Sequence, residues 1–410
     1  MEAKPAGKFR PMLFKLAIMF GALSACLLVL ELGVRVLGLA SAPSDAGGES
    51  IQHVVQFDSK LETRYKPGAR TTIKSQYGEF EVEYVFNELG LRDRPLNGSE
   101  SEAPRRILAL GNSFVEGWGL PAQDTFLRVA ENRLNGGDAE RSVRIVNAGA
   151  SGYGAAQCYL LMQDLMPRVR PDAVVFFYVG TMMVADHRFV SRANLDEQGL
   201  ATGLDVRALL QGPTHSGGSS SQESSPSFLT RHSHLVRLIA TRMANAESMT
   251  NLIPGDPTTD LLAPYRMPSS QRDSLHEATW RHIAAMARMA EEAGAPFLVV
   301  HLPMPFEVSP VEWSRGKEIY DVADKTVQSD DIAVATKAAL DAAGIPWVSA
   351  YDLLAEKTAQ QEGDPRLYFD TDFHLNKSGA RAVGHWLAKQ LQMSLMGGEI
   401  ALHPDATTPR

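Results

Sequence analysis

Five short apolar segments constrain the fold of this chain more than any other feature. Each segment consists mostly of apolar residues and is too short to form a long buried helix. A strand that is apolar along its whole length is covered on both faces, which is typical of a parallel sheet between two helical layers. The five segments are RRILALG (105–111), SVRIVNAG (142–149), DAVVFFYVG (172–180), APFLVVHLP (295–303) and IPWVSA (345–350).

Four segments with helical periodicity alternate with these strands. Gly294 and Gly344 stand where the C-terminus of a helix favours glycine. Strands and helices in this order predict an α/β fold, a flavodoxin-like doubly wound sheet of five parallel strands over residues 105–395. The helical segments are AQDTFLRVAENRL (122–134), SLHEATWRHIAAMARMAEEAG (274–294), DIAVATKAALDAAG (331–344) and KSGARAVGHWLAKQLQ (377–392).

The composition argues against some partners. The 410 residues carry a formal net charge of -8, whereas a nucleic-acid-binding surface is basic, so we expect no nucleic acid partner. The two cysteines, Cys26 and Cys158, lie outside any metal-ligand spacing. We therefore expect neither a metal nor another cofactor.

Residues 1–40 have the pattern of a membrane anchor. Basic residues precede an uncharged run over 16–30, which continues to residue 40 with only Glu31 and Arg35 as charges. These two are four apart and can pair on one helix face. We expect a single transmembrane helix with its N-terminus in the cytoplasm and the main domain on the periplasmic side of a bacterial inner membrane. A lipoprotein signal ending at Cys26 and a cleaved signal peptide are the alternatives.

The segment before the predicted domain, 41–104, divides into two parts. Residues 41–55 are rich in Ser, Gly and Ala and predict a linker. In the rest, EFEVEYVF (79–86) alternates with period two, as a strand does. This extension is too short to fold alone, so we expect it to pack on the main domain.

A long insert, 188–270, separates the third predicted strand from the next long helix. Its low-complexity core, 212–227, predicts disorder, and 232–249 has the pattern of an amphipathic helix. The insert is either part of a lid or partner surface, or a tolerated surface insertion. Residues 396–410 form a tail.

Ser113 stands directly after the first predicted strand, in GNSFVEGWG (111–119). Ligands of doubly wound sheets bind beyond the carboxyl ends of the strands, where a helix N-terminus would favour negative charge. Ser113 is therefore a candidate nucleophile at a place able to stabilise an oxyanion. The alternative is that Ser113 is only the N-cap of the next helix.

The candidate partners of Ser113 lie in YFDTDFHLNKSG (368–379). Asp372 and His374 stand two residues apart in a polar loop after the fifth strand, hence at the same edge of the sheet. A carboxylate placed there can orient the imidazole and stabilise its protonated form. The alternative is a loop histidine that makes a structural hydrogen bond with Asp370 or Asp372.

The pair GNSFVEGWG and DTDFHLNKSG resembles the SGNH, or GDSL, hydrolase superfamily. NAGASGYGAAQ (147–157) resembles the second block of that family. FNELGLRDRP (86–95) and the N-terminal anchor are similar to its membrane-anchored bacterial subgroup. The resemblance extends over residues 60–185 and 290–392.

This resemblance implies a flavodoxin-like sheet and a catalytic triad of Ser113, His374 and Asp372. It implies an oxyanion hole built from the N–H groups of Ser113 and Gly152. An α/β-hydrolase fits less well, because Val115 stands where the last glycine of its Gly-Xaa-Ser-Xaa-Gly turn is required.

The chain departs from the family pattern in two places. Asn112 replaces the aspartate of Gly-Asp-Ser, which we interpret as a mild change because that aspartate is not the acid of the triad. After the third strand, where the family has an asparagine that donates to the oxyanion, this chain has Thr181 and Met182. Methionine cannot donate, and losing one such donor costs about 10²–10³ in turnover. Thr181, or a residue of the insert, is the candidate substitute.

Asp186 and His187 follow the same strand and are interpreted as a solvated loop pair. Two functions remain open. The first is a serine esterase or acyltransferase that acts on an ester, with O-acetylated extracytoplasmic glycans as the substrates that the resemblance implies. The second is a catalytically weak or inactive module that retains the fold to bind a glycan or to assist assembly.

Overall fold

The computed structural model describes residues 51–75, 77–96, 105–136, 143–205, 262–267, 269–309, 311–319, 331–360 and 366–395, with scattered residues of 18–32. The chain divides into two compact units, Met1–Gly48 with Ser216–Leu252 and Glu49–His215 with Ile253–Arg410. Only short helical pieces of the first unit are described. The second unit contains the sheet and the candidate site.

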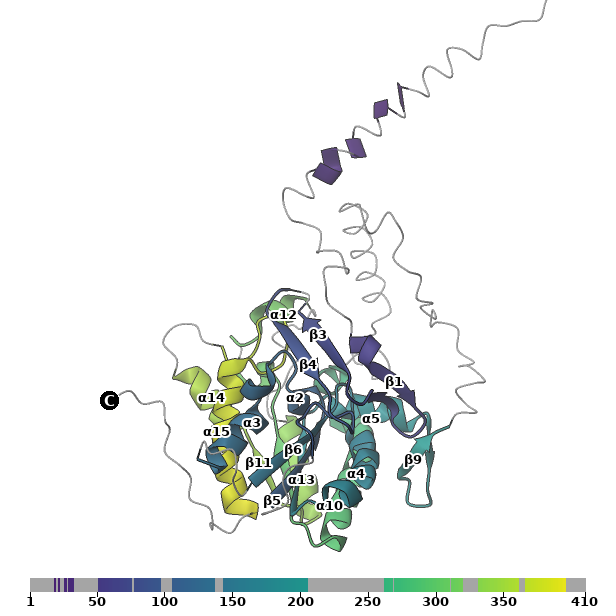
Figure 1. Cartoon of the computed structure of the whole chain (residues 1–410), viewed down its shortest axis with the longest axis vertical. Coiled ribbons are helices and arrows are strands. Elements are labelled where there is room, and N and C mark those ends of the chain that lie inside the picture. Colours follow the sequence, from purple (N-terminus) through teal and green to yellow (C-terminus); the bar gives the residue numbers. More distant parts are fainter. Residues whose placement is uncertain are drawn as a thin grey trace, which may run out of the picture. The chain divides into compact units, whose positions relative to one another are not determined.

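A five-stranded parallel sheet forms the centre of the second unit (Figure 1). Its strand order is β11-β10-β7-β5-β6, which in chain order is the 2-1-3-4-5 arrangement of flavodoxin-like folds. The predicted fold class and all five predicted strands are confirmed. The strands are β5 (Arg105–Gly111), β6 (Val143–Gly149), β7 (Ala173–Tyr178), β10 (Phe297–His301) and β11 (Trp347–Ser349).

Helices cover both faces of this sheet (Figure 1). On one face α3 packs against α15 and α14 lies beside α15, while on the other α10 packs against α4, α5 and α13. The four predicted helices are present, and α4, α5 and α14 are additional. The main helices are α3 (Phe126–Leu134), α4 (Ala155–Val169), α5 (Met182–Val190), α10 (Ser269–Glu292), α13 (Asp331–Ala342), α14 (Tyr351–Ala359) and α15 (Lys377–Leu395).

The double cover explains why the strands are apolar throughout. Every residue of β7 and β10 is buried, and the register pairs Val299 with Phe176 in the middle of the sheet. Because no strand residue of this pair faces water, an alternating polar pattern would leave polar groups buried. All five strands run in one direction, so their carboxyl ends meet at one edge.

The N-terminal extension consists of a 3-10 helix and two hairpins. The predicted linker ends earlier than residue 55, because Val54 is buried and the next residue begins a strand. Residues 41–50 lie outside the described residues. The elements are η1 (Ile51–Val54), β1 (Val55–Asp58), β2 (Glu62–Tyr65), β3 (Arg70–Lys74) and β4 (Glu81–Val85).

Arg92 attaches this extension to the main sheet, as predicted for the extension as a whole. Its guanidinium lies 3.4 Å from the centroid of the Tyr84 ring. It donates hydrogen bonds to the carbonyl oxygens of Glu116 and Gly117, at 3.0 and 2.7 Å, and of Leu120, at 2.5 Å. Arg92 is 4% exposed, so these bonds form away from water.

The predicted insert is described only at its two ends. Its first part is a hairpin of β8 (Ala193–Leu195) and β9 (Ala201–Leu204), which is held by a 2.8 Å bond from the N–H of Leu204 to the Ser59 carbonyl. Its low-complexity core and predicted amphipathic helix lie outside the described residues. Most of the predicted anchor does too, and among the residues that are described no helix is long and apolar enough to span a membrane.

Replacement of Arg92 by methionine removes three hydrogen bonds to buried carbonyl oxygens. We expect Arg92→Met to lower the free energy of unfolding by about 2–4 kcal/mol. The matched control is Arg70→Met in the same extension, because Arg70 is 68% exposed and forms only a surface ion pair with Glu83. It should change stability by less than about 0.5 kcal/mol. Equal denaturant midpoints for the two variants would contradict this role of Arg92.

Candidate active site

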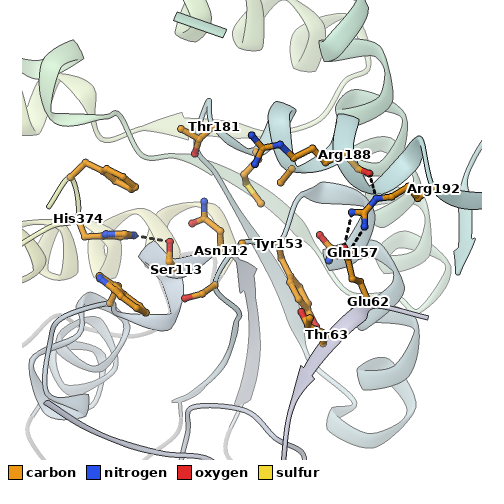
Figure 2. A pocket seen from close by; sticks show the side chains of 16 residues that line it. Glu62, Thr63, Asn112, Ser113, Tyr153, Gln157, Thr181, Arg188, Arg192 and His374 are labelled. Carbon is orange, nitrogen blue, oxygen red and sulfur yellow. Dashed lines mark hydrogen bonds and ion pairs between the residues drawn. The ribbon is translucent and has the colours of Figure 1, made fainter. Parts of the chain in front are cut away.

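Ser113 is the first residue of α2 (Ser113–Glu116), a single turn that begins just beyond the end of β5. The N-cap of this turn is Asn112, whose backbone is extended and whose Oδ1 accepts the N–H of Phe114 at 3.1 Å. The interpretation of Ser113 as a mere cap is therefore wrong. Its hydroxyl is directed away from the helix and into a cavity (Figure 2).

His374 lies between Ser113 and Asp372. Its Nε2 is 2.7 Å from Oγ of Ser113, a residue 261 positions away in the chain. Its Nδ1 is 2.5 Å from Oδ1 of Asp372, which also accepts the backbone N–H of His374 at 3.0 Å. The three predicted triad residues are thus brought together, and the Ser113–His374 bond is drawn in Figure 2.

The contacts determine which ring nitrogen of His374 carries the proton. A carboxylate only accepts hydrogen bonds, so Nδ1 donates to Asp372 and Nε2 of the neutral ring accepts from the Ser113 hydroxyl. Burial raises the pKa of Asp372, but the charge of His374 and hydrogen bonds from His374 and Trp118 outweigh burial and leave that pKa below its ordinary value. Asp372 is therefore a carboxylate beside the ring.

Aromatic rings enclose the imidazole. The rings of Phe114 and Phe373 each lie 4.7 Å from that of His374, centroid to centroid. Nε1 of Trp118 donates to the second oxygen of Asp372 at 3.1 Å. His374 is only 6% exposed, so its orientation is set by packing as well as by hydrogen bonds.

Two residues of the cavity wall, Ser113 and Gly152, are candidates for backbone donors to an oxyanion. Gly152 follows β6 and has a φ of 81°, a conformation that favours glycine. It and Ser113 line the same cavity. Among the described residues neither of their N–H groups has an acceptor. This is the arrangement that an oxyanion requires.

Thr181, the proposed third donor, lines this cavity together with Met182. It is the N-cap residue of α5, is 5% exposed and makes no cap bond with its side chain. Figure 2 shows it across the cavity from Ser113 and Asn112. The third predicted oxyanion residue is thus in the site, on the wall opposite the triad.

Asp186 corrects the interpretation of a solvated loop pair. It lies within α5 and is fully buried, so no water reaches it. Its carboxylate accepts the N–H of Ala156 at 2.8 Å and the hydroxyl of Thr279 at 2.6 Å, and burial raises its pKa. A Cβ on Gly154 would lie 2.2 Å from its oxygen. Asp186 therefore caps α4 and fixes the loop that carries Gly152.

Glu116 supports the same loop from the other side and was not predicted from the sequence. Its buried carboxylate accepts hydrogen bonds from Tyr65, at 3.0 Å, and from the hydroxyl of Ser151. Burial raises the pKa of Glu116. Because Ser151 immediately precedes Gly152, this contact ties the oxyanion loop to the helix of the nucleophile.

Glu79 is the second supporting residue that the sequence does not reveal. It comes from the segment between β3 and β4, and its carboxylate accepts the backbone N–H groups of Asp370, Thr371 and Asp372 at 2.6, 3.0 and 3.1 Å. The hydroxyl of Thr371 also bonds to it. The N-terminal extension thus holds the loop that carries the acid and the histidine.

The cavity has a volume of about 400 Å³. At the end away from the triad, Arg192 forms a two-pronged ion pair with Glu62 (Figure 2). In the part of the chain that the structure describes, no cluster of His, Cys, Asp and Glu could hold a metal ion. The residues lining the cavity are Glu62, Thr63, Asn112, Ser113, Trp118, Ser151, Gly152, Tyr153, Gln157, Thr181, Met182, Ala185, Arg188, Arg192, Phe373 and His374.

No known protein family and no functionally curated protein matches the chain. It is similar to solved structures of lipases, acylhydrolases and esterases. A GDSL-like lipase from Bacteroides thetaiotaomicron is 14% identical, with 71% of this chain and 89% of that chain covered and a TM-score of 0.35. A lipase/acylhydrolase from Enterococcus faecalis is 10% identical, with 73% and 100% covered and a TM-score of 0.36.

A psychrotrophic esterase from Pseudoalteromonas is 10% identical, with 70% of this chain and 97% of that chain covered and a TM-score of 0.32.

Loss of the Glu79 carboxylate should loosen the loop of Asp372 and His374. We expect Glu79→Ala to lower the turnover of an ester substrate by about 10–100-fold, because displacement of a catalytic group by ~1 Å has an effect of this size. The matched control is Glu81→Ala in β4, which removes only a surface ion pair with Lys74. Identical turnover in both variants would show that Glu79 does not position the triad.

Proposed function

We propose that this protein is a serine hydrolase of the SGNH type that cleaves an ester through an acyl-enzyme. The observation that carries the proposal is the continuous hydrogen-bonded chain from Ser113 Oγ through His374 to Asp372, at 2.7 and 2.5 Å. An isolated serine or histidine has many structural uses. A serine that faces a cavity and bonds to an imidazole oriented by a carboxylate has the parts of a nucleophilic triad.

Acylation follows from these contacts. Nε2 of His374 takes the proton of the Ser113 hydroxyl as Oγ attacks the ester carbonyl carbon, and Asp372 stabilises the imidazolium that forms. The electron pair of the carbonyl moves to its oxygen, which accepts hydrogen bonds from the N–H groups of Ser113 and Gly152. When the tetrahedral intermediate collapses, His374 returns the proton to the departing alcohol.

Deacylation repeats these steps with a new nucleophile. His374 deprotonates a water molecule, which attacks the acyl carbon and releases the acid, and Ser113 regains its proton. A second alcohol in place of water would make the protein an acyltransferase. Hydrolysis is our proposal, because no alcohol-binding site is required for it.

The substrate class and the location form the finer part of the proposal. We propose O-acyl groups of an extracytoplasmic glycan as substrates and a single-pass anchor in the inner membrane. The motif resemblance supports the former. The charge and apolar pattern of residues 1–40, which lie mostly outside the described residues, supports the latter.

A second candidate function is favoured by one observation. Thr181 and Met182 stand on the cavity wall where the resembling family has an asparagine. A site without this donor could bind an acylated glycan and turn it over slowly or not at all. The intact contact between Ser113 and His374 is the reason to place this binding module second.

Replacement of Ser113 by alanine should abolish activity. We expect Ser113→Ala to lower hydrolysis of a short-chain p-nitrophenyl ester by at least about 10⁴-fold and to abolish labelling by a fluorophosphonate probe. Ser191→Ala is the matched control, because Ser191 is exposed and does not line the cavity. It should still be labelled. A parent protein without turnover, together with a Ser113→Ala variant that still binds glycan, would instead support the binding module.

Acidification should remove the proton acceptor of Ser113 without protonating Asp372. A protonated imidazole cannot take the proton of Ser113, so kcat/KM should fall on acidification with the loss of one functional group. The pKa of Asp372 lies below its ordinary value, so this carboxylate stays ionised over that fall. The measurement is the pH profile of p-nitrophenyl ester hydrolysis. A slope of log kcat/KM against pH that is steeper than the slope for uptake of one proton would contradict this account.

A further inference from the structure

The wall of the cavity beside Ser113 carries a hydrogen-bond donor that the mechanism above does not use. Asn112 lines the cavity and is 7% exposed. Its Oδ1 is occupied by the N–H of Phe114 at 3.1 Å. Its amide nitrogen, Nδ2, has no hydrogen-bond acceptor among the described residues. Solvent reaches this atom, since it is absent from the buried side-chain atoms of the described residues that lack a partner.

The orientation of this amide is determined by the helix cap. A backbone N–H can bond only to the oxygen end of an asparagine amide, so a flipped amide would place two donors against each other. With Oδ1 on the helix, Nδ2 points to the opposite side. Figure 2 shows that side facing the cavity, toward Thr181 and next to the Ser113 hydroxyl.

The position of Nδ2 suits a reacting carbonyl oxygen. Asn112 immediately precedes Ser113, whose own N–H is one of the two backbone donors at this place. Of the two residues that follow the third strand, Met182 cannot donate and Thr181 lies across the cavity from Asn112. An ionised aspartate at 112 would have no proton to donate at that place.

We propose that Nδ2 of Asn112 is the third hydrogen-bond donor to the oxyanion, and that Asn112 is a catalytic residue. This inference rests on the proposed ester hydrolysis. The amide donates a hydrogen bond and transfers no proton. This hydrogen bond strengthens in the transition state, because the carbonyl oxygen becomes negative there.

The isosteric variant Asn112→Asp tests this directly. Its Oδ1 can still accept the N–H of Phe114, so the cap remains while the donor is lost. We expect kcat for a p-nitrophenyl ester to fall about 10²–10³-fold with KM changed less than about threefold. Asn112→Ser keeps a cap oxygen without a charge or a reaching amide, and it should lose activity to a similar degree.

Asn194→Asp is the matched control, because it makes the same exchange at a side chain outside the cavity, where Nδ2 donates to the Leu204 carbonyl oxygen. It should retain kcat within about threefold. Thermal unfolding of all three variants separates loss of the donor from loss of the fold, and their melting temperatures should stay close to the parent value. A kcat at the parent value in both Asn112 variants would overturn the proposal.

The rate of fluorophosphonate labelling distinguishes failure of this inference from failure of the proposed function. The parent protein should be labelled rapidly, and both Asn112 variants slowly, since the phosphonyl oxygen uses the same donors. A parent that is neither labelled nor active would contradict the proposed hydrolysis. A parent and Asn112 variants that are labelled equally fast would leave hydrolysis standing and reject the role of Asn112.

Discussion

The hydrogen bond between His374 and Ser113 is the interaction on which the functional account depends. It joins residues 261 positions apart, so it forms only when the first and last parts of the sheet meet at one edge. The 2-1-3-4-5 strand order meets this requirement, because it places β5 in the interior of the sheet and brings the segment after β11 back over its carboxyl end. Asp372 and the surrounding aromatic rings then leave the imidazole little freedom to turn.

Carboxyl groups from elsewhere in the chain hold the loops of the candidate site. Glu79, which is half-buried, accepts three successive N–H groups of the loop of Asp372, while the fully buried Glu116 and Asp186 hold the loop of Gly152 from two sides. Burying a carboxyl group is costly unless it is hydrogen-bonded, and Glu116 and Asp186 each accept at least two hydrogen bonds. Through Glu79 and Tyr65, the N-terminal extension therefore supports the candidate site.

The sequence predicts the sheet and the triad because both depend on local patterns. Apolar runs mark the strands, and Ser113 and His374 follow strand ends, which topology brings together. Glu79 could not be found in this way, since it lies 291 positions from its partner at residue 370, in the turn of a hairpin without a recognisable motif. Asp186 was misinterpreted because its neighbours in sequence do not report its burial. The direction of the Asn112 amide depends on its single hydrogen bond with the N–H of Phe114, which the sequence does not show.

The central claim is that Ser113 becomes covalently acylated during turnover. To measure this directly, the protein is mixed with an excess of a slowly hydrolysed ester, the reaction is quenched rapidly, and its peptides are analysed by mass spectrometry. The account predicts one acyl group per protein, located on the peptide that contains Ser113 and absent when His374 is replaced by alanine. Ester turnover without any acyl group on Ser113 would contradict it.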